Sequence, residues 1–184
     1  RQLPTIVQAL RTALPRADLQ VIESRSEAHA EQVCRGAVAQ ASTLLVMGGD
    51  QVYPYATRAR YRQQTELPYL LTAQAQPDSV RPTPESAALV AIPGNHDWYG
   101  GTSLFDELLV KADTFVGHWQ APQTERWWVV KLSHGWWLWG IDTALDNTLD
   151  GEQRAYFTNA ATLLAAGDRV ILCDSKGVVY KGRT

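Results

Sequence analysis

The sequence predicts an α/β fold in which a mixed parallel and antiparallel β-sheet is flanked by helices. Three patterns predict it: a strand, a helix and a strand in succession near the start, a continuous apolar strand near the middle, and an aromatic hairpin in the second half. No internal repeat or domain boundary interrupts residues 1–184, so we expect a single domain.

The beginning of the chain has the pattern of a βαβ unit preceded by a short helix. Apolar residues at helical spacing predict that helix over 4–14. A strand over 19–22, a helix over 24–40 that opens with a capping box, and a strand over 43–47 follow. The unit implies a parallel pair of strands with functional groups at their carboxyl ends, and Asp50 stands at such an end.

Prolines dominate the next segment, and a buried strand follows it. Five prolines in 51–85 indicate a connection that runs mostly over the surface, with one helix fitting over 56–65. The apolar run 87–92 predicts a strand, which a proline and a glycine close. A helix is expected over 102–110.

The second half of the chain predicts an antiparallel hairpin, a helix and a last core strand. Aromatic and β-branched residues fill 127–132 and 136–141, and a short Ser-His-Gly turn joins the two runs. Asp150 can cap a helix over 151–166, and 170–173 reads as a core strand.

Composition excludes several classes of function. The 17 basic and 19 acidic residues leave a net charge of −2, so no nucleic-acid partner is expected from charge. No apolar run approaches the roughly 20 residues that a membrane span needs. Cys34 and Cys173 form neither a disulfide framework nor a metal-binding motif, which favours a reducing, cytoplasmic compartment.

The two ends of the chain indicate whether the predicted domain is complete. It opens at Arg1 without a methionine or a signal pattern, and it stops at Thr184 shortly after the last predicted strand. We expect that both ends are cut from a longer protein and that the domain is truncated.

Polar residues follow two of the predicted strands and form the candidate site. Asp50 comes after two glycines, where a carboxylate can bridge two cations. Asn95 offers a neutral carbonyl ligand, His96 a ligand or a proton donor, and Asp97 a group that can orient the imidazole. Taken alone, Asp50 is more often an ordinary turn residue, but the second cluster favours a metal site. Trp98, directly after it, could line a pocket, as could Tyr99.

These residues resemble the calcineurin-like metallophosphoesterases, in particular a bacterial branch of that superfamily. The resemblance rests on GGDQVYP at 48–54, IPGNHDWY at 92–99 and WWLWGID at 136–142. It implies a four-layer αββα sandwich and a centre of two divalent ions. It also implies that Asp50 bridges the ions, that Asn95 binds the second ion and that His96 assists the transition state. Hard oxygen ligands and imidazole suit manganese, iron or zinc.

The sequence also departs from the family pattern. At the expected Asp-x-His motif it has Glu23-Ser24-Arg25, in which Glu23 is either a replacement oxygen ligand or a solvated acid at a strand end. The arginine cannot bind a metal. Where a later histidine is expected, the chain has Asp174, which reads more readily as a turn residue.

Three functions follow from the sequence. The first is metal-dependent hydrolysis of a phosphate ester, with His96 and Asp97 in catalysis. The second is an inactive fragment or degenerate member that keeps the fold with an incomplete metal site. The third is a nucleotide-binding α/β module, for which the signal is weak because no glycine-rich phosphate motif is present.

Overall fold

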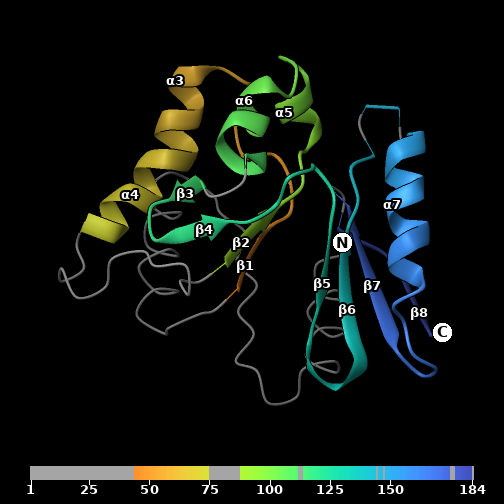
Figure 1. Cartoon of the computed structure of the whole chain (residues 1–184). Helices are drawn as coiled ribbons and strands as arrows, with labels where there is room; N and C mark the ends of the chain where they lie inside the picture. Colours follow the sequence, from red (N-terminus) through yellow and green to blue (C-terminus); the bar gives the residue numbers. More distant parts are fainter. Residues whose placement is uncertain are drawn as a thin grey trace.

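The structure is a computed structural model that describes residues 44–74, 88–111, 114–143, 145–146, 148–174 and 177–183. The elements predicted before residue 44 lie outside this part of the chain, and so do Glu23 and Cys34. Within it, eight strands form two four-stranded sheets (Figure 1). The described part is therefore mixed α/β, as the sequence predicts.

The first sheet has the strand order β1-β2-β4-β3. Its strands are β1 (Leu44–Met47), β2 (Ala88–Ala91), β4 (Trp119–Ala121) and β3 (Thr114–Val116). β1 and β2 run parallel with Leu44 opposite Ala88, whereas β3 and β4 run antiparallel. The parallel pair confirms the strands predicted over 43–47 and 87–92.

The second sheet has the order β5-β6-β7-β8. Its strands are β5 (Trp128–Lys131), β6 (Trp136–Gly140), β7 (Arg169–Asp174) and β8 (Gly177–Arg183). β5 and β6 form the predicted antiparallel hairpin around Ser133–Gly135. β7 is parallel to β6 and antiparallel to β8, so this sheet is mixed.

Helices occupy more of the proline-rich segment than the sequence predicts. α3 (Arg58–Arg60) continues through a π-helical segment, Tyr61–Glu66, into α4 (Leu67–Gln74). The helix predicted over 56–65 is thus present from Arg58, and the expectation of surface connection is wrong for 66–74. Pro68 is the second residue of α4 and lies inside this continuous helical run, directly after the π-helical segment, where its lack of an N–H interrupts the regular α-helical hydrogen-bond pattern.

Helices lie at 102–110 and from residue 151 as the sequence predicts, and a further short helix that was not predicted follows β2. α5 (Asn95–Trp98) follows β2, and α6 (Ser103–Phe105) continues as a π-helical segment, Asp106–Val110. α7 (Gly151–Ala161) begins after Asp150, whose side chain accepts a hydrogen bond from the Gln153 N–H at 2.7 Å. It ends earlier than the predicted 166, because the chain turns after Ala161. No helix in the described ranges is long and apolar enough to cross a membrane.

Strand β2 contributes to two separate cores. Leu89 and Ala91 pack into a core with residues of the helical segments and of β4, among them Tyr61, Phe105 and Trp119. Val90 and Ile92 pack into a second core with residues of the other sheet, among them Trp128, Trp136 and Ile171. Alternate side chains of a strand point to opposite faces, so helices cover one face of the first sheet and the second sheet covers the other.

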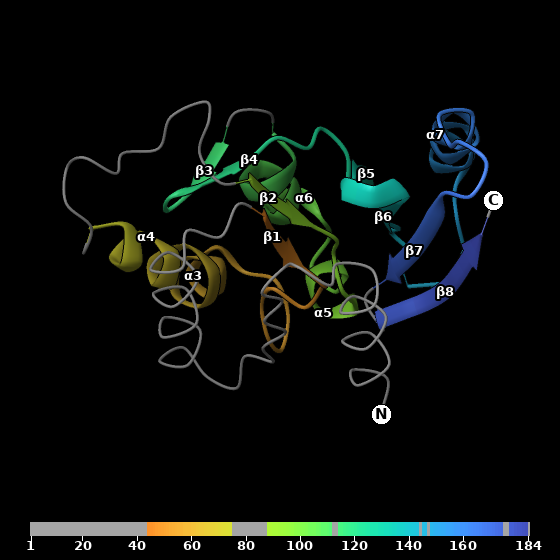
Figure 2. The same ribbon diagram turned by 90° about the horizontal axis from the view of Figure 1, so that it is seen from below.

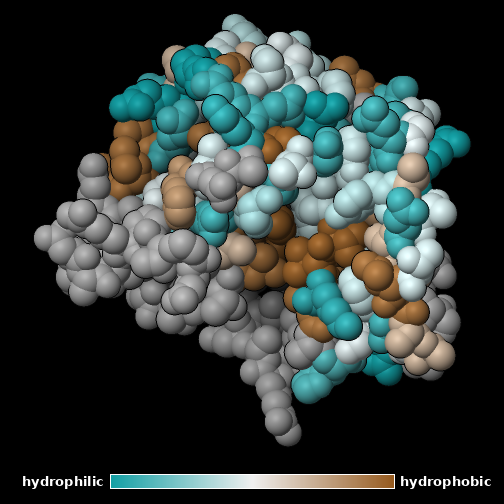
Figure 3. All heavy atoms as spheres, in the orientation of Figure 1, coloured by the Kyte–Doolittle hydropathy of each residue, from teal (hydrophilic) through white to brown (hydrophobic). Residues whose placement is uncertain are grey.

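Helix α7 packs on the outer face of the second sheet. The Trp139 and Phe157 rings stack with their centroids 5.2 Å apart. Figures 1 and 2 show the resulting order across the molecule, from α3 and α4 through the two sheets to α7. In Figure 3, apolar residues gather in the middle of the visible face, below a largely polar area over the helices.

Buried side-chain hydrogen bonds join the two sheets at Ala91. Gln123 accepts from the Ala91 N–H at 2.6 Å and donates to the Ala91 carbonyl at 3.0 Å. The Trp128 indole donates to the same carbonyl at 2.9 Å. Gly140 makes room for this indole, because an added Cβ would lie 2.7 Å from Trp128 Nε1. The last residue of β2 is thereby fixed, and the chain that leaves it is the one that carries Asn95 and His96.

Candidate functional site

The two predicted motifs meet at one edge of the first sheet. Because β1 and β2 are parallel neighbours, their carboxyl ends lie side by side, and each is followed by one of the motifs. The His96 N–H donates to Asp50 Oδ1 at 3.1 Å. The structure therefore brings Asp50 and the turn that carries Asn95 and His96 into direct contact, although 46 positions separate Asp50 and His96 in the sequence.

Asp50 is an exposed carboxylate held in an uncommon backbone conformation. Its φ is 53°, in the left-handed region that aspartate tolerates better than most residues. Its side chain lies directly against Gly94, where an added Cβ would be 2.7 Å from Asp50 Cγ and closer still to Oδ1. Gly94 is therefore required by the close approach of the carboxylate, since its own φ of −95° and ψ of 179° suit any residue.

Asn95 and His96 are each oriented by one hydrogen bond. The Asn95 amide nitrogen donates to the Tyr99 hydroxyl at 2.8 Å, so the atom that Asn95 would offer a metal is its carbonyl oxygen. His96 Nδ1 lies 2.6 Å from the Pro54 carbonyl. A carbonyl only accepts, so Nδ1 carries the proton, and Nε2 is the nitrogen that can exchange a proton with a substrate.

Asp97 is buried and holds the loops rather than the imidazole. The side chain is 0% exposed and accepts hydrogen bonds from the Tyr61 hydroxyl at 2.6 Å, the Gly94 N–H at 2.8 Å and the Gln51 N–H at 3.2 Å. Pro54, not Asp97, bonds the His96 ring nitrogen in the described contacts. The orienting role expected for Asp97 therefore belongs to Pro54, and Asp97 instead joins the turns after β1 and β2.

Burial determines the protonation of the Tyr61–Asp97 pair. Loss of solvent raises the pKa of Asp97, although hydrogen bonds from Tyr61, Gly94 and Gln51 lower it in part. Burial and the charge of Asp97 raise the pKa of Tyr61. The phenol therefore stays protonated and acts as the donor of the 2.6 Å hydrogen bond.

This shift predicts a pH dependence of stability. A carboxyl with a higher pKa in the folded state binds its proton more tightly there, so the free energy of unfolding falls as pH rises from the ordinary aspartate pKa of about 4 through the raised value. We expect Asp97→Asn to flatten this fall, measured by urea unfolding at a series of pH values.

Asp146→Asn is the matched control for the pH series. Asp146 is exposed, and hydrogen bonds from Thr148 lower its pKa, so it contributes stability that increases with pH. Asp146→Asn removes a contribution that increases with pH, so this variant cannot flatten the fall of the unfolding free energy with pH. An Asp97→Asn variant with the same slope as the unmodified protein would show that Asp97 does not titrate in this window.

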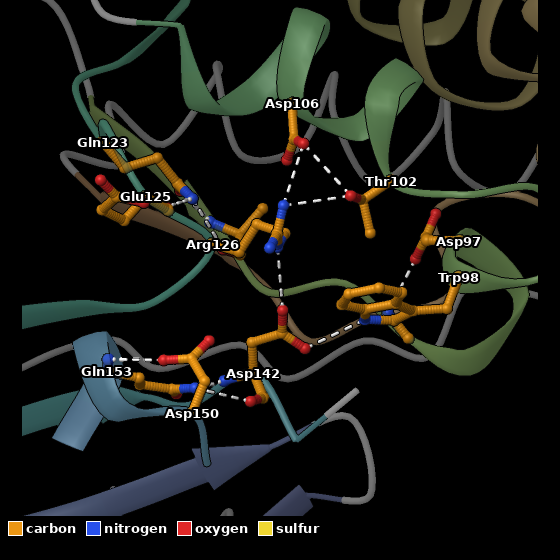
Figure 4. Close-up of polar contacts among 12 residues, drawn as sticks. Asp97, Trp98, Thr102, Asp106, Gln123, Glu125, Arg126, Asp142, Asp150 and Gln153 are labelled. Atoms are coloured by element: carbon orange, nitrogen blue, oxygen red, sulfur yellow. Dashed lines mark hydrogen bonds and ion pairs between the residues drawn. The ribbon is translucent and has the colours of Figure 1, made fainter. Parts of the chain in front are cut away.

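Arg126 connects the site helices to the second sheet (Figure 4). Its Nε lies 3.0 Å from Asp142 Oδ2, after β6, and its Nη1 lies 3.0 Å from both Thr102 Oγ1 and Asp106 Oδ2, at α6. The Trp98 indole donates to the other Asp142 oxygen at 3.0 Å. Trp98, expected to contact substrate, thus has its polar atom committed to this network.

The same network reaches α7 through a buried glutamine. Gln153 accepts from the Asp142 N–H at 2.9 Å and donates to the Asp142 carbonyl at 2.8 Å. Asp142 is therefore bonded at its backbone as well as at its side chain. Asp142 is only 4% exposed, and its carboxylate binds Arg126 and Trp98 to the loop that follows β6.

The remaining candidate residues are distributed as follows. Asp174 ends β7 and is buried, and Glu23 lies outside the described residues. Among the described residues, no three or more His, Cys, Asp or Glu side chains gather as a group that could hold a metal ion. The Asp50 carboxylate and the Asn95 side chain, on the two adjoining turns, would need further ligands to complete an ion's coordination.

Comparison of the chain with protein-family models, curated proteins and solved structures finds no match. The function proposed below is therefore inferred from the geometry of the site.

Sequence reasoning missed several residues that shape the site. Tyr61 lies in the helix predicted over 56–65, but nothing in its neighbourhood indicated that it is the buried partner of Asp97. Arg126 belongs to none of the motifs and lies in a loop, where an arginine is normally exposed to solvent. Pro54 belongs to the motif at 48–54 and Asp142 to the motif at 136–142, but neither motif indicated that Pro54 contacts His96 or that Asp142 pairs with Arg126.

Proposed function

We propose that this chain carries a metal-dependent phosphoesterase centre that hydrolyses a phosphate ester. The observation that supports it most is the direct contact between Asp50 and the Asn95–His96 turn at the carboxyl ends of two adjacent parallel strands. Ligand sites of α/β sheets form at such ends. An exposed carboxylate, an amide oxygen and an imidazole are the groups that metal-assisted hydrolysis uses.

Asp50 and Asn95 would hold the metal through hard oxygen atoms. A centre of two divalent ions, manganese, iron or zinc, would activate water and offset the negative charge that develops on the phosphoryl oxygens. Glu23 is the candidate for a further ligand from its place in the sequence. The exposed position of Asp50 leaves its carboxylate accessible to an ion.

His96 would exchange a proton with the leaving oxygen through Nε2. The hydrogen bond from Nδ1 to the Pro54 carbonyl leaves Nε2 as the nitrogen that exchanges the proton. The hydrogen bond from the His96 N–H to the Asp50 carboxylate holds the His96 turn beside Asp50, the proposed metal ligand. Proton transfer from a positioned side chain contributes about 10²-fold to 10⁴-fold to rate.

The scaffold we propose is the four-layer αββα sandwich of the calcineurin-like phosphoesterases. It is supported by the order of helices, sheet, sheet and helix across the molecule and by the division of β2 side chains between two cores.

The test is hydrolysis of p-nitrophenyl phosphate with manganese, alongside metal content. We expect about two divalent ions per chain and measurable turnover in the unmodified protein. Asp50→Ala should lose both metal and turnover. His96→Ala should keep the metal and lose about 100-fold or more in kcat/KM.

Asp146→Asn, an exposed carboxylate changed elsewhere, is the control for the loss of a charge. Unchanged turnover in Asp50→Ala would remove the metal-bridging assignment. Fewer than two ions per chain together with no turnover would favour an inactive member that keeps the fold.

A further inference from the structure

The His96 ring is in contact with two exposed tyrosine rings. The Tyr53 ring centroid is 4.5 Å from that of His96, and the Tyr99 centroid is 5.2 Å from it on a nearly perpendicular plane. Tyr53 is 65% exposed and Tyr99 is 57% exposed. Two large, solvent-exposed aromatic residues thus adjoin the residue proposed to protonate the leaving group.

Both tyrosines are held in place although they are exposed. The Tyr53 N–H donates to Gln64 Oε1 at 2.8 Å, and Gln64 donates back to the Tyr53 carbonyl at 3.1 Å. The Tyr99 hydroxyl accepts from Asn95 at 2.8 Å. Binding to groups that are already ordered loses less conformational entropy, so these rings are suited to receive a ligand.

We propose that Tyr53 and Tyr99 form a subsite for a planar aromatic group on the leaving-group side of the substrate. This inference rests on the proposed function, because the leaving oxygen must lie near His96 to receive its proton. The group attached to that oxygen then lies beside the two tyrosines. Aromatic rings prefer offset-stacked or edge-to-face contacts with one another, which gives a planar aromatic group an advantage over a saturated one of similar size.

A neighbouring tyrosine provides a matched control. Tyr55 comes from the same loop and is 49% exposed, but the Arg60 guanidinium covers its ring at 4.0 Å from the centroid. Tyr55→Leu therefore removes an exposed aromatic residue of the same loop that takes no part in the proposed subsite.

The substrates are benzyl phosphate and cyclohexylmethyl phosphate. Both release a primary alcohol of similar size, and they differ in the planarity and π-system of the ring. In the unmodified protein we expect a higher kcat/KM for benzyl phosphate. Tyr53→Leu should lower that value about tenfold and change the value for cyclohexylmethyl phosphate less than about twofold.

Two further variants separate the ring from the hydroxyl. Tyr99→Leu should reduce the preference for benzyl phosphate, whereas Tyr99→Phe, which keeps the ring, should retain it. Tyr55→Leu should leave the ratio of the two kcat/KM values unchanged. A ratio that is the same in all variants would overturn the subsite.

A binding measurement separates failure of the subsite from failure of the proposed function. The probes are 2-phenylethylphosphonate and 2-cyclohexylethylphosphonate, in which a methylene replaces the ester oxygen, and binding is measured by calorimetry. Tighter binding of the phenyl compound that Tyr53→Leu abolishes, without turnover of either ester, would overturn the esterase function and support the subsite. Turnover of both esters without a preference for the phenyl compound would support the esterase function and overturn the subsite.

Discussion

Replacing Arg126 by alanine should lower the free energy of unfolding by about 3 kcal/mol. The guanidinium makes hydrogen bonds to Asp142, Asp106 and Thr102 in a part of the molecule where its own side chain is 25% exposed and that of Asp142 only 4%. Removing the cation takes away the guanidinium that offsets part of the cost of burying the Asp142 carboxylate. It also removes the only side chain among those contacts that reaches both α6 and the chain after β6.

Arg58→Ala is the matched control for Arg126→Ala. Arg58 also pairs with a carboxylate, that of Glu107, but both side chains are 56% exposed. Exposed ion pairs contribute about 0 to 1 kcal/mol because water and salt screen them. Urea unfolding of the two variants should therefore give clearly different midpoints. Equal losses of stability would mean that the Arg126 network does no more than an ion pair at the surface.

Replacing Gly94 by alanine should displace Asp50 and disrupt the candidate site. The added Cβ would lie within the volume of the Asp50 carboxylate and close to its backbone nitrogen, so the two turns would have to move apart. We expect a loss of about 1 to 3 kcal/mol in stability, the usual cost of overpacking. Manganese binding should fall by more than this loss explains, because the proposed ligand itself is moved.

Gly48→Ala tests whether the effect comes from this contact. Gly48 belongs to the same pair of turns, but nothing lies within 4 Å of the position that its Cβ would take. Unfolding by urea gives the stability of both variants, and titration with manganese gives their affinity. A Gly94→Ala variant as stable as Gly48→Ala would contradict the close contact between Gly94 and Asp50, whatever the manganese affinities of the two variants.

The strands that carry the site could be predicted because their signals are local. The runs 43–47, 87–92 and 170–173 are apolar over the length of a strand and end at turn residues, which identifies a buried strand without knowledge of its neighbours. The hairpin around Ser133–Gly135 is likewise encoded within a few residues. The contact between Asp50 and the His96 turn followed from the parallel pairing of two such strands.

The remainder of the fold depends on contacts that the sequence does not reveal locally. β3 and β4 have three residues each, which is too short for a periodic pattern. The role of Asp97 depends on Tyr61, 36 positions away, and Arg126 meets partners 16 to 24 positions away. Residue types alone placed Asp97 with its neighbour His96, whereas burial assigned it to Tyr61 and the two loops.

The division of β2 between two cores has a consequence for how the molecule unfolds. Leu89 and Ala91 face one core and Val90 and Ile92 the other, so neither core can open without exposing a strand on which the other depends. The two sheets are therefore expected to belong to one cooperative unit rather than to two independently melting halves. Amide protons of β2 and β6 should accordingly exchange with solvent in the same opening event. The turn that carries His96 directly follows β2, so we expect it to open only when β2 opens.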